Sequence, residues 1–168
     1  LTMTCAATAQ KEGVGFPGQL GVYSDDHLEG LTRLAAGIKA HDSHAVVQLH
    51  HAGMRSPVAL ISRAPQCPSD DAETGAKAMT RDEVKQSIDA FIDAARRCDR
   101  AGFNGVELHG AHGHLICEFL SAEINRRHDD YCGSLENRSR FQSVELKRLG
   151  SGQTDHFVRW MFAHPFFL

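Results

Sequence analysis

The sequence predicts an α/β fold, because segments typical of strands alternate with amphipathic helical segments between residues 1 and 120. Strands that alternate with helices form parallel sheets with right-handed crossovers. The predicted strands also carry polar residues near their C-terminal ends. Such residues suit the mouth of a (β/α)8 barrel, whereas a doubly wound sheet buries both of its faces. We therefore expect a partial (β/α)8 (TIM) barrel with about three βα units.

The first predicted unit is a strand followed by a helix. Residues 1–9 show no helical stripe and end at a polar, glycine-rich stretch, which favours a strand that leads into a loop. Ser24 is typical of a helix N-cap, and Asp25 and Asp26 suit a first helical turn. Apolar residues then recur at helical spacing up to about His41 (Leu28, Leu31, Leu34 and Ile38).

The second unit begins with the apolar and β-branched run at residues 45–49, which predicts a buried strand. Residues 52–79 contain three prolines and little periodicity, so we expect a long connection that builds an active-site loop. Thr80 and Glu83 match a capping box at the start of a helix. Its apolar stripe stops at Ala101, with Gly102 as the natural C′ residue.

The third unit combines a strand at residues 103–109 with a short helix at 115–120. A further helix is expected within residues 135–149. The last residues, from Gly150 to Phe167, follow neither the helical nor the strand period. The expected division is a barrel part at residues 1–141 and a divergent tail at residues 142–168.

Strand geometry places the chemically interesting side chains on one face. Gln48 and His50 alternate with apolar neighbours, and Glu107 and His109 do the same in the next strand. The apolar set is expected to face the helices (Val47, Leu49, Val106 and Leu108). The polar set then faces the barrel mouth.

Composition excludes several classes of partner. Among the 168 residues, 18 Lys and Arg stand against 21 Asp and Glu, for a formal net charge of -3, so a basic surface for nucleic acid is not expected. No apolar run reaches the length of about 20 residues that spans a bilayer, and no signal peptide is evident. Five widely spaced cysteines suggest free thiols and a cytoplasmic location. Because the chain begins with Leu1, we expect a fragment.

A glycine motif near the start is expected to be a plain loop. Residues 13–18 match G-x-G-x-x-G, which elsewhere binds a dinucleotide between a strand and a helix. Pro17 interrupts this motif, and Gln19-Leu20-Gly21-Val22 follows it before the helix cap at Ser24. The motif therefore does not predict dinucleotide binding.

Three histidines in six residues are the main chemical signal: His109, His112 and His114. Spacing alone leaves three interpretations open. His109 and His112 could bind a metal with Glu107 or His50, they could donate hydrogen bonds to an oxygen that gains negative charge, or the polar residues could cap the following helix.

Two polar strand residues have open roles as well. Gln48 could bond a neighbouring strand or the donor and acceptor edge of a flavin pyrimidine or a nucleobase. Glu107 would be costly to bury as a lone charge, so an ion pair with Arg126 or Arg127 is expected.

Three long stretches of the sequence are more informative about function than the spacing of single residues. VVQLHHAGMRSP at 46–57, AGFNGVELHGAHGHL at 101–115 and FLSAEINRRHDDYCGSLENRSRF at 119–141 resemble the old yellow enzyme family of FMN-dependent NADH:flavin oxidoreductases and ene-reductases. The resemblance covers about residues 1–141. It implies a (β/α)8 barrel with FMN at its C-terminal mouth, reduction of FMN by NAD(P)H, and hydride transfer to an activated alkene or a related small-molecule acceptor.

The resemblance also assigns residues. Gln48 matches the glutamine that bonds the flavin pyrimidine, Ala6 matches a residue whose backbone lies against the flavin, and His109 and His112 match the pair that holds the substrate oxygen. His114 stands where the family usually has a proton-donating tyrosine. No metal is expected.

The chain departs from the family's pattern in two further ways, one residue substitution and its length. Cys132 replaces the second glycine of the family's YGGS turn, so strain is expected there if the position needs positive φ. A complete barrel needs about 250 residues, so this chain would hold only the second, third and fourth βα units and could self-associate through uncovered edges. The rival interpretations are a non-catalytic remnant without a competent cofactor site and, more distantly, a metal-dependent barrel hydrolase.

Overall fold

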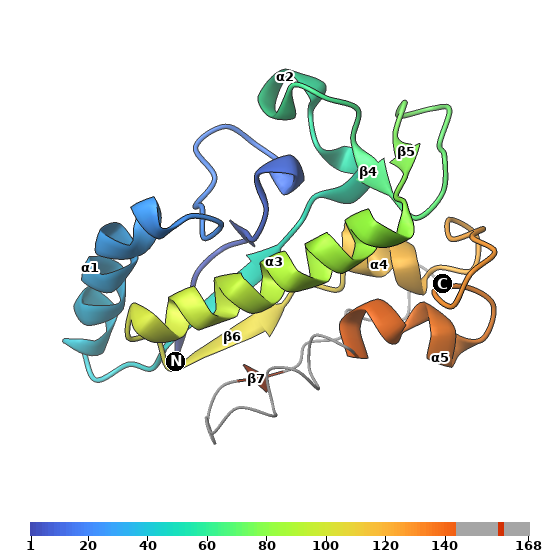
Figure 1. Cartoon of the computed structure of the whole chain (residues 1–168). Helices are drawn as coiled ribbons and strands as arrows, with labels where there is room; N and C mark the ends of the chain where they lie inside the picture. The colour runs from blue at the N-terminus through green and yellow to red at the C-terminus, as the bar shows by residue number, and fades with distance from the viewer. Residues whose placement is uncertain (144–157, 160–168) are drawn as a thin grey trace.

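A parallel sheet forms the centre of the computed structural model, which describes residues 1–143 and 158–159. β3 lies in the middle of the sheet: β1 and β2 pair with one of its edges and β6 with the other, and β7 pairs with β6. All of these pairings are parallel, which confirms the predicted strand arrangement (Figure 1). The strands are β1 (Thr2–Met3), β2 (Ala7–Thr8), β3 (Ala45–His50), β6 (Gly105–Leu108) and β7 (Val158–Arg159).

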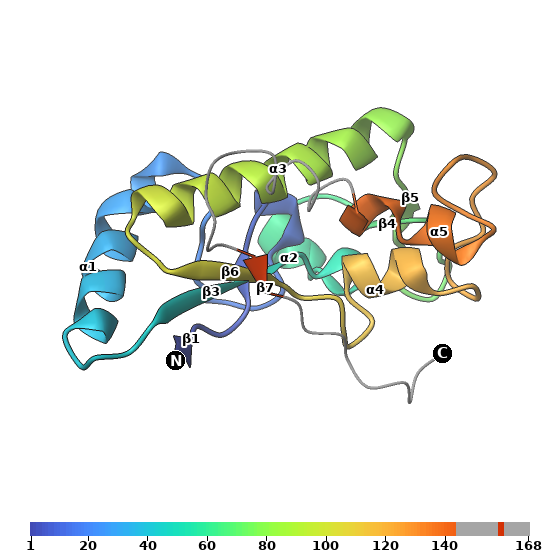
Figure 2. The same cartoon turned by 90° about the horizontal axis from the view of Figure 1, so that it is seen from below.

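The two longer helices, α1 (Leu28–Lys39) and α3 (Arg81–Arg100), pack on each other and on the sheet. In both views α3 runs lengthwise along β3 and β6 (Figures 1 and 2). Two shorter helices, α4 (Leu115–Leu120) and α5 (Leu135–Arg138), lie toward the C-terminal ends of these strands. The order of strands and helices gives the three predicted βα units.

The predicted capping box opens α3. Thr80 Oγ1 accepts from the Glu83 backbone N–H at 3.2 Å, and Glu83 Oε2 accepts from the Thr80 backbone N–H at 2.8 Å. These bonds satisfy two backbone donors that a helix N-terminus would otherwise leave unpaired. At the other end, Gly102 adopts a φ of +85°, as expected for the C′ residue of a helix.

Ion pairs and an aromatic contact hold the helices together. Arg97 and Arg100 of α3 both donate to Asp25, in the turn η2 (Asp25–His27) that precedes α1, and this pairing lowers the pKa of Asp25 to about 2. In the core, Phe141 stacks on Phe119 of α4, with ring centroids 4.7 Å apart. Burying an aromatic side chain of this kind stabilises the fold by about 1.5–3 kcal/mol.

The long connection at residues 52–79 contains short regular elements that the sequence pattern does not reveal. They are η3 (Gly53–Arg55), α2 (Val58–Ile61), β4 (Gln66–Cys67) and β5 (Lys77–Ala78), the last two forming a separate parallel pair. Elements of two to four residues are too short to show a period. The strand predicted at residues 1–9 likewise splits into β1 and β2. The predicted loop at residues 13–18 is confirmed.

The expected strain at Cys132 is wrong. Within the described residues, the non-glycine positions with positive φ are Asp42, Ser62 and His112, and in this turn it is Gly133 that carries a positive φ, of +89°. The Cys132 thiol donates instead to the Asn125 carbonyl at 3.1 Å.

Two further sequence predictions fall partly outside the described residues. The helix expected within residues 135–149 corresponds to α5 and to helical residues 140–143, and its remainder lies outside. The tail expected at 142–168 is described only at residues 142–143 and in β7. Among the described residues, no helix has both the length and the hydropathy that crossing a membrane requires.

Candidate active site

Alternation along β3 and β6 separates an apolar face from a polar face, as predicted. Val47 and Val106 are fully buried in the core. On the opposite face Gln48 lies in register with Glu107, and its Nε2 donates to Glu107 Oε1 at 2.8 Å. The parallel register also sets Ala6 beside Gln48, because Ala7 pairs with Leu49. Gln48 and Glu107 thus form a polar row across two adjacent strands, and Ala6 precedes β2 at the edge of this row.

The partner expected for Glu107 is wrong. Arg127 forms an ion pair with Asp129, with Nη2 and Oδ2 2.7 Å apart, and Arg126 donates to the Asp70 carbonyl at 3.2 Å. Both arginines hold the segment after α4 against the 66–79 connection. Glu107 is buried, and Gln48 supplies its hydrogen bond instead.

The next row toward the C-terminal strand ends contains imidazoles. His109 follows β6, and its backbone N–H donates to the Leu49 carbonyl at 2.9 Å, which continues the ladder beyond the strand. The chain then turns through His112, at a φ of +58°, and Gly113, at +66°. This turn brings His112 Nδ1 to 3.2 Å from His109 Nε2, so one ring donates to the other.

His114 lies on the other side of His109. Its Nδ1 is 3.4 Å from the Ala52 carbonyl, and its ring centroid is 5.3 Å from that of His109 but 6.4 Å from that of His112. Although His114 is the N-cap residue of α4, its side chain makes no capping hydrogen bond. The helix-capping part of that interpretation is therefore wrong for His114, whereas its contact with the Ala52 carbonyl agrees with a side chain that satisfies loop backbone.

Two residues join the site that spacing alone did not identify as a unit. His50 is buried, and its ring lies edge-on to His114 with centroids 4.4 Å apart. Gln19, from the loop after the glycine motif, has its Nε2 3.0 Å from His50 Nδ1. The position of His50 on the polar face was a usable signal, whereas nothing in the local sequence marks Gln19.

Gln19 is held in one orientation. Its Oε1 accepts from the Gly15 backbone N–H at 2.7 Å, and its Nε2 donates to the Ala6 carbonyl at 2.9 Å. An amide nitrogen only donates, so the second N–H of Gln19 donates to His50 Nδ1. In the neutral His50 ring the proton therefore sits on Nε2.

Burial keeps the clustered imidazoles uncharged. Desolvation, with His114 and His109 nearby, lowers the pKa of His50 to about 3. Desolvation, with His114 and His112 nearby, lowers the pKa of His109 to about 4. Burial also lowers the pKa of His114. At neutral pH these rings are hydrogen-bonding groups without net charge.

The loop after β3 is tied to the histidine loop. Arg55 Nε donates to the Gly113 carbonyl at 3.1 Å, and the Met54 backbone N–H donates to Glu118 Oε1 at 2.9 Å. Glu118 lies one turn into α4 and is fully buried, and this burial raises its pKa well above the usual value. Gly53 leaves the space for this carboxyl, since a Cβ there would lie 2.1 Å from Glu118 Oε1.

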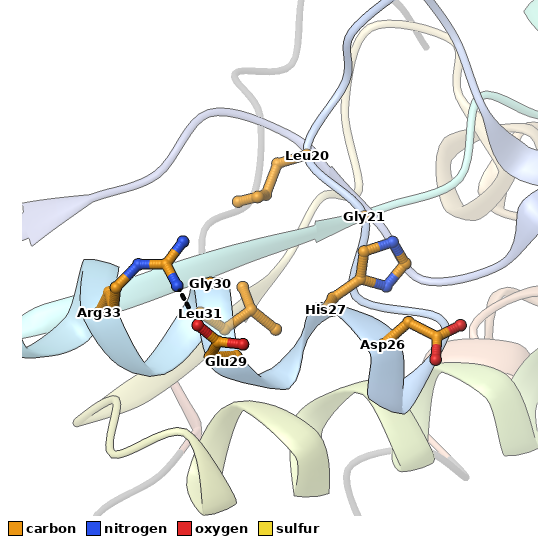
Figure 3. Close-up of a pocket in the computed structure, with 8 residues that line it drawn as sticks. All are labelled: Leu20, Gly21, Asp26, His27, Glu29, Gly30, Leu31 and Arg33. Atoms are coloured by element: carbon orange, nitrogen blue, oxygen red, sulfur yellow. Dashed lines mark hydrogen bonds and ion pairs between the residues drawn. The ribbon is translucent and has the colours of Figure 1, made fainter.

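A surface pocket of about 340 Å³ lies elsewhere, at the start of α1. Figure 3 shows Leu20 and His27 among its lining residues, with Arg33 paired to Glu29 at its border. It contains none of the predicted site residues. Its chemistry offers no convergent set of groups comparable to the imidazoles.

Known proteins resemble this chain closely. Residues 1–148 match the model of the NADH:flavin oxidoreductase / NADH oxidase family. A probable NADH-dependent flavin oxidoreductase of Bacillus subtilis is 38% identical over 160 residues, covering 93% of this chain and 43% of the relative. An NADPH dehydrogenase of Bacillus cytotoxicus is 43% identical over 142 residues, covering 84% and 41%. The chain thus spans about two fifths of the length of these relatives.

Solved structures agree on the fold. A 2-naphthoyl-CoA reductase aligns with a TM-score of 0.89 at 29% identity, over 94% of this chain and 27% of that one. The old yellow enzyme homologue of Zymomonas mobilis aligns with a TM-score of 0.85 at 29% identity, over 94% and 49%. These neighbours are TIM barrels, so the predicted partial barrel is confirmed.

Proposed function

This chain belongs to the NADH:flavin oxidoreductase / NADH oxidase family, and we propose that it carries flavin-contacting and substrate-contacting units of an FMN-dependent NAD(P)H oxidoreductase. Bound FMN would supply hydride transfer from NAD(P)H to an activated alkene or a related small-molecule acceptor. The observation that carries the proposal is the position of His109 and His112, whose ring nitrogens lie 3.2 Å apart one row beyond Gln48.

The polar row fits the pyrimidine edge of a flavin. Gln48 uses one amide N–H on Glu107, which leaves its Oε1 and second N–H to meet an acceptor and a donor of a heterocycle. The amide is only half-buried, so it faces the open side of the sheet. Ala6 would add backbone from the neighbouring strand. Gln48 and Ala6 are the residues we propose to hold the cofactor.

The substrate oxygen would bind at the imidazoles. The bond between the His109 and His112 rings already uses one N–H, so the N–H that remains on the pair would donate to the oxygen, and a donor directed at an oxygen that gains charge accelerates a reaction. His114 is the proposed proton donor to the acceptor in its protonated form, since Nδ1 faces the Ala52 carbonyl; burial lowers the pKa of His114, so this step should slow as the pH rises. Its neighbour His50 fixes the ring from the buried side.

Three finer points belong to this proposal. We place the barrel part at residues 1–141 and a divergent tail at 142–168, although the family match continues past this boundary to residue 148. We propose a cytoplasmic location, which agrees with five free cysteines. We also propose self-association through the sheet edge at β1, which within the described residues pairs only with β3.

The test is FMN binding by the purified 168-residue chain, followed by flavin fluorescence with circular dichroism on the same sample. We expect saturable binding that Gln48→Ala weakens about tenfold, the effect of losing one net hydrogen bond. Gln86→Ala, an exposed site on α3, is the matched control. A folded chain that binds no FMN would refute the proposal and favour the non-catalytic remnant.

Once binding is established, the substrate side can be tested separately. Oxidation of the reduced flavin by an activated alkene should slow by about 10²–10³ in His109→Ala, as for loss of one donor to a developing oxyanion. An unchanged rate would remove His109 from the reaction. His114→Tyr tests the proton donor: the wild-type rate should fall as the pH rises, and the variant, with a phenol of reference pKa about 10, should lose this dependence. A flat wild-type profile would leave His114 without that role.

A further inference from the structure

We infer that His50, His109 and His114 form a binding site for a divalent transition-metal ion of the Zn²⁺ class, and that Gln19 weakens this site. One ring nitrogen from each of the three histidines lies within 4.8 Å of the others. His50 is buried and the other two are half-buried, so the cluster is shielded but reachable. The set differs from the metal interpretation of the sequence, since His112 is not in it and Glu107 bonds Gln48.

The donor chemistry selects the class of ion. Three neutral imidazoles suit Zn²⁺, Co²⁺, Ni²⁺ or Cu²⁺, whereas Mg²⁺ and Ca²⁺ require oxygen ligands. Zinc binds imidazole nitrogen at about 2.0–2.1 Å in tetrahedral geometry, which leaves a fourth position open when a protein supplies three ligands. Binding would draw the three ring nitrogens together from the 4.8 Å within which they now lie.

His114 supplies the third ligand of the proposed site. It lies between His50, at a centroid distance of 4.4 Å, and His109, at 5.3 Å. Its Nδ1 faces the Ala52 carbonyl, which leaves Nε2 as the ligand atom. A metal-bound histidine commonly donates its other N–H to a carbonyl in this way.

Gln19 opposes binding at His50. Because the Gln19 amide donates to Nδ1, the proton of the neutral ring lies on Nε2, the nitrogen that would otherwise be a free ligand. A carboxylate at position 19 would accept from Nδ1–H and leave the Nε2 lone pair free. Supporting groups of this kind change metal affinity by about 10–100-fold.

Metal occupancy also bears on the reaction, and this part rests on the proposed function. His109 would hold both the ion and the acceptor oxygen, so an ion at this site excludes the acceptor. Binding of the metal itself requires no flavin. Failure of flavin binding and failure of metal binding are therefore separate results.

The first experiment titrates the flavin-free chain with ZnCl₂ by calorimetry and with CoCl₂ by visible absorption. We expect one ion per chain, imidazole-type cobalt bands without thiolate charge transfer, and no uptake of Mg²⁺. His114→Tyr should lower the affinity at least tenfold, as should His50→Asn if the first variant loses its circular dichroism. His41→Tyr, at an exposed position after α1, should bind as the wild type does.

The second experiment is a gain of affinity, which a purely structural role of Gln19 would not produce. Gln19→Glu should tighten Zn²⁺ binding about tenfold or more, whereas Gln86→Glu on the surface of α3 should not. Absence of saturable binding by the wild type, or equal binding by His114→Tyr, would overturn the site. Equal binding by Gln19→Glu would overturn the role of Gln19.

Discussion

Glu118→Gln should make the stability of this chain less dependent on pH. The carboxyl is fully buried, and this burial raises its pKa well above the usual value of 4.5. As the pH rises above 4.5, the unfolded chain loses a proton that the folded chain still holds, so the free energy of unfolding falls until the folded-state pKa is reached. Glutamine keeps the shape and the acceptor for Met54 but has no proton to lose.

The magnitude follows from proton linkage. In this window one group reduces the free energy of unfolding by about 1.4 kcal/mol for each pH unit. The stability of Glu118→Gln relative to the wild type should therefore rise by about 1.4 kcal/mol per unit as the pH increases. Urea unfolding followed by circular dichroism, at steps between about pH 5 and about pH 7, measures this slope.

A matched control separates burial from the mere loss of a carboxylate. Glu123 is exposed just after α4, and Glu123→Gln should reproduce the pH slope of the wild type. If Glu118→Gln and the wild type show parallel profiles, then Glu118 does not hold a proton in the folded chain. That result would refute the reasoning from burial.

Three further changes test local structure by urea unfolding. Gly53→Ala should cost at least about 2 kcal/mol, because Gly53 has a φ of +62° and a Cβ would overlap Glu118; a loss below about 1 kcal/mol would contradict this. Thr80→Ala should cost about 1 kcal/mol through loss of the cap on Glu83, whereas Thr80→Ser should retain most of it. Cys132→Gly should cost about 0.5–1 kcal/mol, and a gain in stability would reveal strain at Cys132.

Local signals predicted the fold where they were strong and long. The capping box at Thr80 and the glycine at 102 bounded α3 correctly, because both act through neighbouring backbone groups. The alternation in β3 and β6 was equally reliable, since successive side chains of a strand point to opposite faces of the sheet, even though nearly all of these residues are buried. The β4–β5 pair escaped prediction because two-residue strands depend on a distant partner rather than on a pattern of their own.

The candidate site also contains residues that the sequence could predict and residues that it could not. His109 and His112 could be paired from the sequence, because they are only three positions apart. Gln19 could not, since its contact with His50 crosses 31 positions and depends on how the glycine-containing loop folds back. The expected partners of Glu107 were wrong for a related reason: charge identified suitable arginines, but the register of β3 had already supplied Gln48.

Parallel register explains why so few residues build the site. Strands in parallel register place one residue each in successive rows, so the Gln48 amide gives the buried Glu107 carboxyl a hydrogen-bond partner. The row beyond them, toward the strand ends, holds His50 and His109 and has no acidic partner to charge its rings. Burial then keeps these imidazoles neutral, and neutral rings serve equally as donors to a substrate oxygen and as ligands to a metal. Gln19 sets the tautomer of His50 and so bears on whether this ring can serve as a ligand, although Gln19 lies in a loop outside the sheet.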